Sequence, residues 1–437
     1  MGAEGSKHEK KLYFSDEENQ LLLQTLSKID NNGEKVSTSS LQAYLTNEVT
    51  AEFGVSFVHA LTNGKKIQSF PLLGLSEKLG SFIKGSSEER INLTLTLANV
   101  GESGVYSDKL LKYTETVIEF FEKGVTQKTC WKTSSDTVKT QIAFALLHDL
   151  FYPNEAIKKI WGKGPPHPPV LISLEAFERW WLGHCIFSKL EMEMFKHLFK
   201  FSPAGETSLL PEATQLPKVS PTMLSAAQVM FLNGALPVNL QSKWRFLFST
   251  SKHGWSFSIF MKQIVSKGPT IFVVEDQSGG KFGGFASVSW EVRPQFHGTP
   301  DCFLFSLQPQ AGIFHTTGYN NNFMYLNYLE KNTMPNGFGM GGREELFGLW
   351  LDYDFGKGLV APTCTTFASP QLSQHQELEI SSIEVWALGP EEEDSDEEEG
   401  TRKKKSALDK NPDARAMLDM MGKVAVSDGY REEDNDD

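Results

Sequence analysis

The sequence predicts an α+β protein whose first half is helical and whose second half is rich in β-strands. From 12 to 200, apolar residues mostly recur at helical spacing, which is typical of amphipathic helices. From Trp244 to Gly389, short apolar runs rich in Phe, Val and Trp alternate with turns that contain Gly or Asn. This alternation is typical of antiparallel strands, and many short strands predict a sandwich of two packed sheets.

The composition limits the class of protein. A length of 437 residues predicts two or three domains. The formal net charge of −13 argues against a general nucleic-acid binder, because phosphate backbones require a basic surface. The four cysteines are scattered without a CxxC pair, so we expect reduced thiols and no zinc site. The N-terminus is polar and no apolar run is long enough to cross a bilayer, so we expect the protein on the cytosolic side of membranes.

Residues 1–11 predict a lipidated, basic N-terminus. They match the pattern Met-Gly-x-x-x-Ser, in which Gly2 accepts an N-myristoyl group after removal of the initiator Met. Lys7, Lys10 and Lys11 follow. A basic patch is a common second signal, because one myristoyl chain binds a membrane only marginally. The alternative is a disordered polar tail that begins Met-Gly by chance.

The helical half, residues 12–200, contains helix–loop–helix units with the outline of EF-hands. Ser15 and Glu18 predict a capping box at the start of the first helix. A loop at 30–33 separates this helix from the next, and a loop at 99–104 separates a second pair of helices. We therefore predict degenerate EF-hand-like pairs used for packing and recognition, with an ordinary helical bundle as the alternative.

These loops lack the chemistry that binds calcium. An EF-hand needs carboxylates at loop positions 1, 3 and 5 and a bidentate Glu at position 12. With Gly104 at position 6, the corresponding positions hold Asn99, Gly101, Ser103 and Leu110. In the loop near Asp30, Ser40 or Leu41 falls where the closing Glu would be. We expect no metal in either loop.

Two further segments of this half have structural interpretations. The Pro-rich stretch 162–169 is more typical of a connecting loop than of an SH3 ligand, because it is short and lies between helical patterns. The pair Trp180 and Trp181 is more typical of a core than of a binding site. Residues 201–220 carry repeated prolines and are predicted to be a linker or a long surface loop.

The β-rich half, residues 221–389, begins with an apolar helix at 223–232 and contains a second helix at 257–265. The segment 276–281 predicts a hairpin loop. Strands are expected at 244–248, 270–274, 282–290, 302–307, 312–315, 324–326, 346–352 and 383–388.

The order and spacing of six sequence blocks in this half resemble the TLDc domain. The blocks begin at Trp244, Gly283, Thr317, Gly337 and Leu349, and Ile383–Trp386 closes the series. The resemblance covers the whole of 244–389, with 221–240 as the leading helix. The Met-Gly start, the helical region and the charged tail also resemble one subtype of this family, the myristoylated mTOR-associated TLDc proteins related to a nematode EAK protein.

The resemblance implies a fold and a function beyond what the residues themselves show. The family fold is a β-sandwich flanked by helices. The family implies association with the vacuolar proton pump, the V-ATPase, and protection against oxidative stress. The subtype implies a myristoylated protein on the cytosolic face of the lysosomal membrane that supports mTOR signalling.

The β-rich half offers two candidate sets of catalytic residues. Ser249, Ser251 and His253 lie close in sequence, but nothing marks the acid that would orient the histidine. Cys302 and Cys364 would be redox-active only if exposed with lowered pKa values. Both lie in apolar or Thr-rich strands, so buried structural thiols are the favoured interpretation.

Two further motifs fail the test of their context. Gly337, Gly339 and Gly342 match G-x-G-x-x-G, but a dinucleotide loop must follow a strand and open a helix. We favour a Gly-rich loop that lets the backbone pass close to a neighbouring sheet. Asp352 and Asp354 share one face of a strand, but without a third ligand they indicate a solvated face. We predict no enzyme, no cofactor and no metal.

The tail divides into a charged linker at 390–405, a helix at 406–422 and an acidic end at 423–437. The acidic run in the linker is predicted to be disordered, because like charges repel. Asn411 suits the N-cap and Gly422 the end of the helix. One apolar stripe predicts partner binding slightly more than docking on the same chain. The contact candidates are Arg415, Met417, Leu418 and Met421.

The leading hypothesis is therefore a non-enzymatic, lipid-anchored adaptor that binds the V-ATPase and supports mTOR signalling. An oxidation-protective enzyme that uses Cys302 or Cys364 is the second hypothesis. A calcium sensor built on the helical half is the third.

Overall fold

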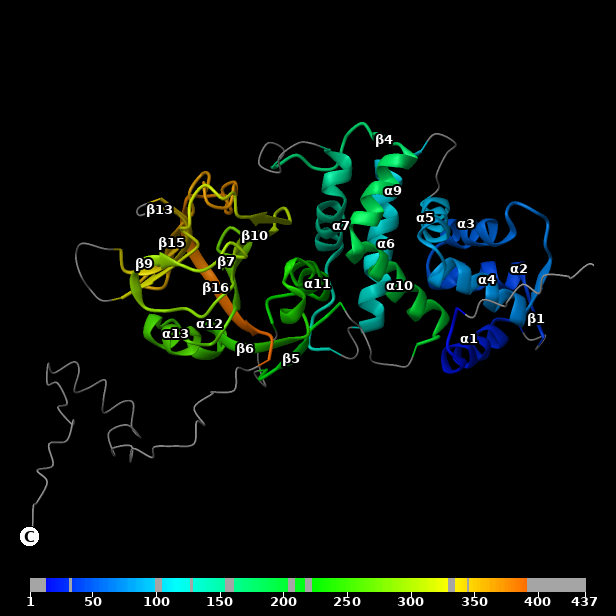
Figure 1. The fold of residues 1–437 in the computed structure, drawn as a ribbon, viewed down its shortest axis with the longest axis horizontal. Helices are drawn as coiled ribbons and strands as arrows, with labels where there is room; N and C mark the ends of the chain where they lie inside the picture. The colour runs from blue at the N-terminus through cyan, green and yellow to red at the C-terminus, as the bar shows by residue number, and fades with distance from the viewer. Residues whose placement is uncertain are drawn as a thin grey trace, which may run out of the picture. The chain divides into compact units, whose positions relative to one another are not determined.

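The computed structural model describes residues 13–390, apart from 31–33, 99–103, 126–128, 154–160, 203–208, 217–221, 329–334 and 344–345. Helices form its first half, and strands with a few helices form its second (Figure 1). The predicted lipidation, membrane and partner residues lie outside the described part: Gly2, Lys7, Lys10, Lys11, Arg415, Met417, Leu418 and Met421.

The first four helices form a pair of EF-hand-like units. A short strand lies in each of the two loops, and β1 (Lys35–Ser37) pairs with β2 (Ser69–Pro71) in an antiparallel ladder. The helices are α1 (Asp16–Ile29), α2 (Thr38–Glu48), α3 (Ala51–Thr62) and α4 (Leu72–Lys84). Two helix–loop–helix units joined through their loops have the EF-hand outline. The sequence predicted the unit with the loop at 30–33, and did not predict the unit whose loop contains β2.

A second pair repeats this arrangement. Its loops contain β3 (Val105–Tyr106) and β4 (Leu171–Ile172), which also pair antiparallel. Its helices are α5 (Ser87–Leu97), α6 (Ser107–Val125), α7 (Asp136–Phe151) and α9 (Leu174–Gly183). The Pro-rich stretch at 162–169 is irregular chain leading to β4, and a further helix, α10 (Cys185–Phe199), packs against α6.

Local sequence signals explain where these helices begin and how the loops close. The capping box at α1 is confirmed, because Ser15 Oγ accepts the Glu18 N–H and the Glu18 carboxylate accepts the Ser15 N–H. Leu41 and Leu110, at or near the closing position of their loops, are fully buried in the core. The Asp30 carboxylate accepts the Ser37 N–H at 2.9 Å. These residues thus pack the core and hold a turn.

The β-rich half contains helices before and among its strands. The leading helix, α11 (Ala226–Ala235), starts later than predicted, because Ser225 and Gln228 form its capping box. The predicted helix at 257–265 is confirmed as α13 (Phe257–Ile264). Two short elements complete the set: η1 (Val238–Leu240) and α12 (Thr250–His253).

The strands form two layers that share β16 (Glu377–Leu388). Its first part pairs with β15, and its later part lies between β6 and β7. One layer contains β5 (Glu212–Thr214), β6 (Lys243–Ser249), β7 (Thr270–Asp276), β8 (Lys281–Ala286), β10 (Phe303–Gln308) and β11 (Gly312–His315). The other contains β9 (Arg293–His297), β12 (Met324–Asn327), β13 (Gly337–Arg343), β14 (Leu346–Asp352) and β15 (Lys357–Leu359).

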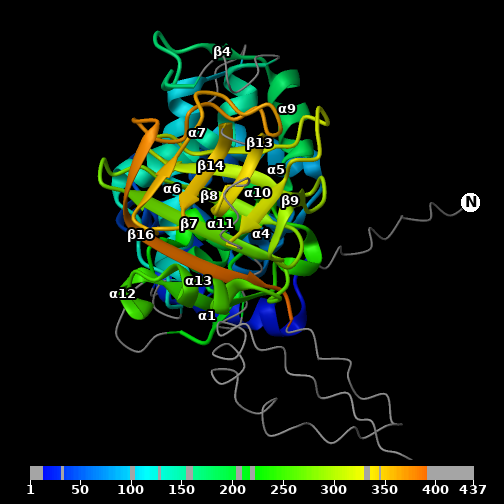
Figure 2. The same ribbon diagram turned by 90° about the vertical axis from the view of Figure 1, so that its left-hand side faces the viewer.

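The two layers pack face to face, as the sandwich prediction requires. Strands β13 and β14 lie across β7 and β8 in Figure 2. The Phe272 ring on β7 meets the Phe338 ring on β13 at 4.8 Å between centroids. Two predictions were wrong in detail. The predicted strand 282–290 ends at Ala286, and the predicted Gly-rich loop at 337–342 is strand β13.

One apolar core connects the helical half with the first layer of the sandwich. It contains buried residues from Phe14 to Leu388. At its centre Trp131, in the segment between α6 and α7, packs on Trp244 of β6 and Trp386 of β16, at 5.8 and 5.0 Å between ring centroids. Trp180 and Trp181 are buried in the same core, as predicted. No helix in the described ranges is long and apolar enough to span a bilayer.

Two buried carboxylates hold the start of α11 and the segment before it. Glu122, from α6, accepts hydrogen bonds from the N–H and hydroxyl of Ser134 and from the Ala227 N–H. Glu384, from β16, accepts hydrogen bonds from the Thr222 hydroxyl, the Met223 N–H and the Trp386 indole. The helical half therefore contacts the first turn of α11 through Glu122, and the sandwich contacts residues 222 and 223 just before this helix through Glu384.

Candidate functional site

The proposed Ser–His combination is a helix cap. Ser249 Oγ accepts the Lys252 N–H at the start of α12, and His253 Nδ1 accepts the Ser249 backbone N–H at 3.1 Å. The His253 ring stacks on Phe248 at 5.2 Å, and burial lowers its pKa. The Ser249 hydroxyl lies 3.0 Å from the Ser251 hydroxyl. This arrangement does not pair the serine hydroxyl with the imidazole, as nucleophilic catalysis requires.

The two cysteines of the redox hypothesis are buried. Cys302 and Cys364 are 0% and 1% exposed, and burial raises the pKa of both thiols. A reactive thiol needs access and a lowered pKa. The structure therefore supports the interpretation of both as structural thiols. Cys130 and Cys185 are exposed.

This difference predicts the outcome of thiol labelling. Under native conditions a maleimide should modify Cys185 readily and Cys130 more slowly, because burial raises the pKa of the Cys130 thiol to about 11. It should reach Cys302 and Cys364 only after unfolding, because both are buried. Mass spectrometry of the labelled peptides measures this. A variant with Cys130→Ser and Cys185→Ser is the matched control, and it should stay unlabelled when folded. Rapid modification of Cys302 or Cys364 in that variant would revive the redox hypothesis.

The glycines at 337–342 make room for aromatic rings. Strand β13 pairs with β12 and β14, and a Cβ on Gly339 would lie 2.8 Å from the Trp350 ring. Gly341 has φ +72°, and a Cβ there would lie 2.6 Å from Cys364 Sγ. The close approach was predicted correctly, although the element is a strand. The motif therefore serves packing, where side chains would clash.

Asp352 and Asp354, which the sequence places on one face of a strand, lie at the surface. Trp350 Nε1 donates to Asp352 Oδ1 at 2.6 Å, and Asp354 is exposed. Asp352 also lines a polar cavity of about 1060 Å3 beside Asp276. Asp276 accepts hydrogen bonds from Ser278, Gly280 and Ser373. Within the ranges that the structure describes, no three His, Cys, Asp or Glu side chains are grouped to hold a metal ion.

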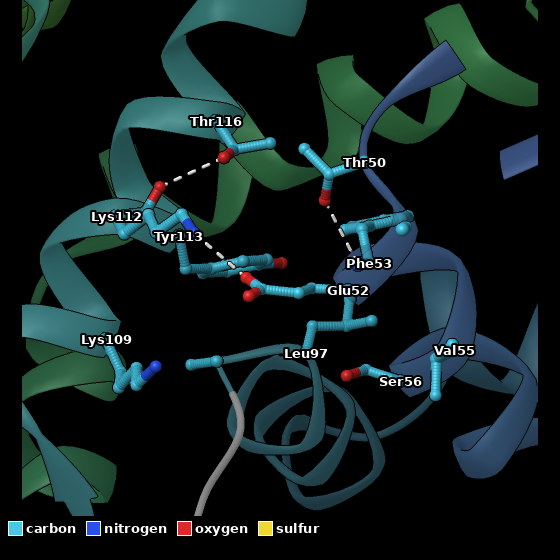
Figure 3. A pocket seen from close by; sticks show the side chains of 12 residues that line it. Thr50, Glu52, Phe53, Val55, Ser56, Leu97, Lys109, Lys112, Tyr113 and Thr116 are labelled. Atoms are coloured by element: carbon cyan, nitrogen blue, oxygen red, sulfur yellow. Dashed lines mark hydrogen bonds and ion pairs between the residues drawn. The ribbon is translucent and has the colours of Figure 1, made fainter. Parts of the chain in front are cut away.

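A second cavity, of about 400 Å3, lies between the two EF-hand-like pairs (Figure 3). Its walls come from the start of α3, the end of α5 and the outer face of α6. Phe53, Leu97 and Tyr113 are buried residues that line it, and Val55, which is 53% exposed, adds an accessible apolar side chain. A cavity of this size and lining is typical of a binding site for a small group or side chain.

Charged side chains line the same cavity. Lys112 Nζ lies 2.9 Å from Glu52 Oε2, and both side chains are mostly exposed (Figure 3). Lys109 stands one turn earlier on α6. The hydrogen bond from Lys112 and the positive charges of Lys112 and Lys109 lower the pKa of Glu52. Thr50 caps α3, with its Oγ1 accepting the Phe53 N–H. The cavity therefore favours a negatively charged group.

A buried carboxylate supports the cavity from behind. The hydroxyl of Tyr113 donates to Glu191 Oε1 at 2.8 Å, and the Thr94 hydroxyl donates to the same oxygen at 2.7 Å. Burial raises the pKa of Glu191 to about 7, although these hydrogen bonds and the charge of Arg90 oppose the rise. The wall of the cavity is thus connected to a titratable group in the core.

The sequence did not predict this cavity. Its walls come from helices that are distant in sequence, so no local pattern marks it. The available signal was the spacing of Lys109 and Lys112 by three residues, which places them on one face of a helix. A basic helix face is more often solvated surface than binding site, so the spacing alone does not identify a cavity.

Comparison with known proteins places these features in context. Residues 218–389 match the family model of the TLDc domain. The MTOR-associated protein MEAK7 of Mus musculus is 36% identical over 385 residues, which cover 82% of this chain and 80% of that protein. The protein of the same name from Gallus gallus is 48% identical over 220 residues, 49% of this chain and 46% of that protein.

A more distant relative matches a smaller part of the chain. The Oxidation resistance protein 1 of Xenopus laevis is 33% identical over 170 residues, 38% of this chain and 19% of that protein. The chain thus spans less than half the length of the Gallus gallus relative and about a fifth of this one. The mouse alignment covers four-fifths of both chains.

Proposed function

This chain belongs to the family of the MTOR-associated protein MEAK7, and from this membership we propose that it acts as a non-enzymatic adaptor in mTOR signalling. The alignment with the mouse protein carries the proposal, because it extends over 82% of this chain rather than over the TLDc domain alone. The relatives' name states an association with mTOR.

The structure supports an adaptor in two ways. Each candidate catalytic set has a structural role: Ser249 caps a helix, and Cys302 is buried. The helical half and the sandwich share one core, so the chain presents both as a single body. An adaptor of this kind binds its partners through surface side chains, and this function requires no catalytic residue.

We propose further that the adaptor works at the cytosolic face of the lysosomal membrane. The N-myristoylation pattern at Gly2, with Lys7, Lys10 and Lys11 nearby, would supply a lipid and a basic patch. The partner would be the V-ATPase, contacted in part through the amphipathic helix that the sequence predicts at 406–422. Its apolar stripe contains Met417, Leu418 and Met421.

Purification of lysosomes tests this proposal. The wild type is compared with Gly2→Ala, which cannot be myristoylated, and with a chain that ends before Ser406. We expect the amount of Gly2→Ala in the lysosomal fraction to be at least tenfold lower than that of the wild type, because a basic patch binds a membrane weakly without the lipid. The truncated chain should stay on lysosomes and lose the proton pump.

A matched control separates the lipid from the sequence change. Ala3→Gly alters the neighbouring residue and keeps Gly2 as acceptor, so it should distribute as the wild type does. If Gly2→Ala and the truncation both behave as the wild type, the anchor and the terminal helix have no role in location or partner binding.

Protection against oxidation is a second candidate function. Its support is the 33% identity with the Oxidation resistance protein 1 of Xenopus laevis over 170 residues, 38% of this chain. A cysteine-based mechanism would have to use thiols other than the buried Cys302 and Cys364, or expose them. The thiol-labelling experiment above decides that point.

A further inference from the structure

We propose that the cavity between α3, α5 and α6 is a docking site for an acidic peptide segment of a partner protein, in which carboxylates flank a large apolar side chain. This proposal goes beyond the adaptor function, because it assigns a binding surface to the helical half. It can also fail while the adaptor function stands.

The apolar part of the cavity accommodates the apolar side chain. Phe53, Leu97 and Ala98 are almost fully buried and line it, and Val55 leaves about half of its surface accessible. A volume of about 400 Å3 is sufficient for one or two large side chains. Covering the accessible surface of Val55 would remove apolar area from water, which favours docking, and the three buried side chains would supply packing contacts.

The charges of the cavity select the flanking groups. Lys109 and Lys112 line one side, and the first turn of α3 with its cap Thr50 lines another. Lys109 has no ion-pair partner among the residues that the structure describes. The start of a helix carries partial positive charge that adds to that of the lysines. A partner segment rich in Asp and Glu is therefore complementary to this surface.

A carboxylate of the chain itself already occupies part of the site. Glu52 extends across the cavity to Lys112, with 2.9 Å between Oε2 and Nζ (Figure 3). Both side chains are more than 60% exposed, and exposed ion pairs contribute little to stability. An incoming carboxylate can therefore replace Glu52 at Lys112. The pair shows where the ligand's carboxylate would bind.

Fluorescence anisotropy with defined peptides tests the proposal on the full chain. The first probe is a labelled peptide with the centre Glu-Glu-Leu-Phe-Glu-Glu. The second replaces the four Glu with Lys, and the third replaces Leu-Phe with Ala-Ala. We expect the first probe to bind at least tenfold more tightly than either of the others, with an affinity that falls as salt rises.

Variants assign the binding to the cavity. The double variant Lys109→Glu/Lys112→Glu should weaken binding of the first probe at least tenfold. Lys123→Glu, which reverses one lysine charge on α6 away from the cavity residues and so makes half of that charge change, should leave it unchanged. Glu52→Gln should tighten binding severalfold, because it removes the competing carboxylate. A gain of affinity cannot arise from loss of folding.

Three outcomes would overturn the proposal. The first is equal binding of the Glu and Lys peptides, and the second is equal affinity of the double variant and Lys123→Glu. The third is binding of vesicles that contain about 20% phosphatidylserine, lost in the Lys109→Glu/Lys112→Glu variant, while the first peptide does not bind at all. That result would assign the surface to a membrane.

Discussion

Replacing Glu122 with Ala should destabilise the folded protein by about 3 kcal/mol or more. The carboxylate is buried and accepts hydrogen bonds from Ser134 and Ala227. Removal of the acceptor leaves buried donors without a partner, and each such group costs about 1–3 kcal/mol. Ala is the best helix former, so the loss cannot be attributed to α6 itself. Urea denaturation followed by tryptophan fluorescence measures the change in the free energy of unfolding.

Glu119→Ala is the matched control for this variant. Glu119 lies one turn earlier on α6, where it forms an exposed ion pair with Lys123. Its removal should change stability by less than about 1 kcal/mol. In Glu122→Ala the unfolding transitions followed by helical circular dichroism and by tryptophan fluorescence should move together to lower urea concentration, because Glu122 connects α6 with α11. Equal stability of the two variants would mean that Glu122 does not hold the halves together.

Replacing Glu191 with Gln should remove a large pH dependence of stability. Burial raises the pKa of Glu191 to about 7 in the folded chain, against about 4.5 for an exposed glutamate. The folded state therefore binds this proton more tightly than the unfolded state does. The resulting stabilisation is fully present below pH 4.5 and is lost as the pH rises through 7. The shift corresponds to about 3 kcal/mol.

The pH dependence is measured as a difference between wild type and Glu191→Gln. The free energy of unfolding is determined for both at pH 5 and pH 8. From pH 5 to pH 8 the wild type should lose about 2–3 kcal/mol relative to the variant, because Gln cannot ionise. Other carboxylates titrate in both proteins and cancel. A difference that stays constant with pH would mean that Glu191 ionises at its ordinary pKa.

Local signals predicted the helical half well. The capping box of Ser15 and Glu18 and the glycine of the second loop, Gly104, mark the EF-hand-like outline directly in the sequence. Leu41 and Leu110 in place of a calcium-binding Glu indicated packing, and both are buried. The pairing of β1 with β2 and of β3 with β4 needed the structure, because strands of two or three residues leave no periodicity.

The strand β13 shows where such signals fail. Its sequence, Gly337 to Arg343, contains four glycines, and glycine disfavours strands. The strand forms because the Trp350 and Phe347 side chains of β14 lie over Gly339. A pattern within β13 cannot show this contact, which depends on its neighbour. The cavity at Lys109 and Lys112 could not be predicted for the same reason, because its lining residues come from helices that are distant in sequence.

The amount of mTOR recovered with this chain from purified lysosomes tests most directly whether it acts as the lipid-anchored adaptor in mTOR signalling that we propose. Immunoprecipitation of the tagged wild type from the lysosomal fraction should recover mTOR. The same procedure with Gly2→Ala should recover at least tenfold less, because that variant leaves the membrane. Recovery of the same amount of mTOR with both chains, or of no mTOR with the wild type, would contradict this role.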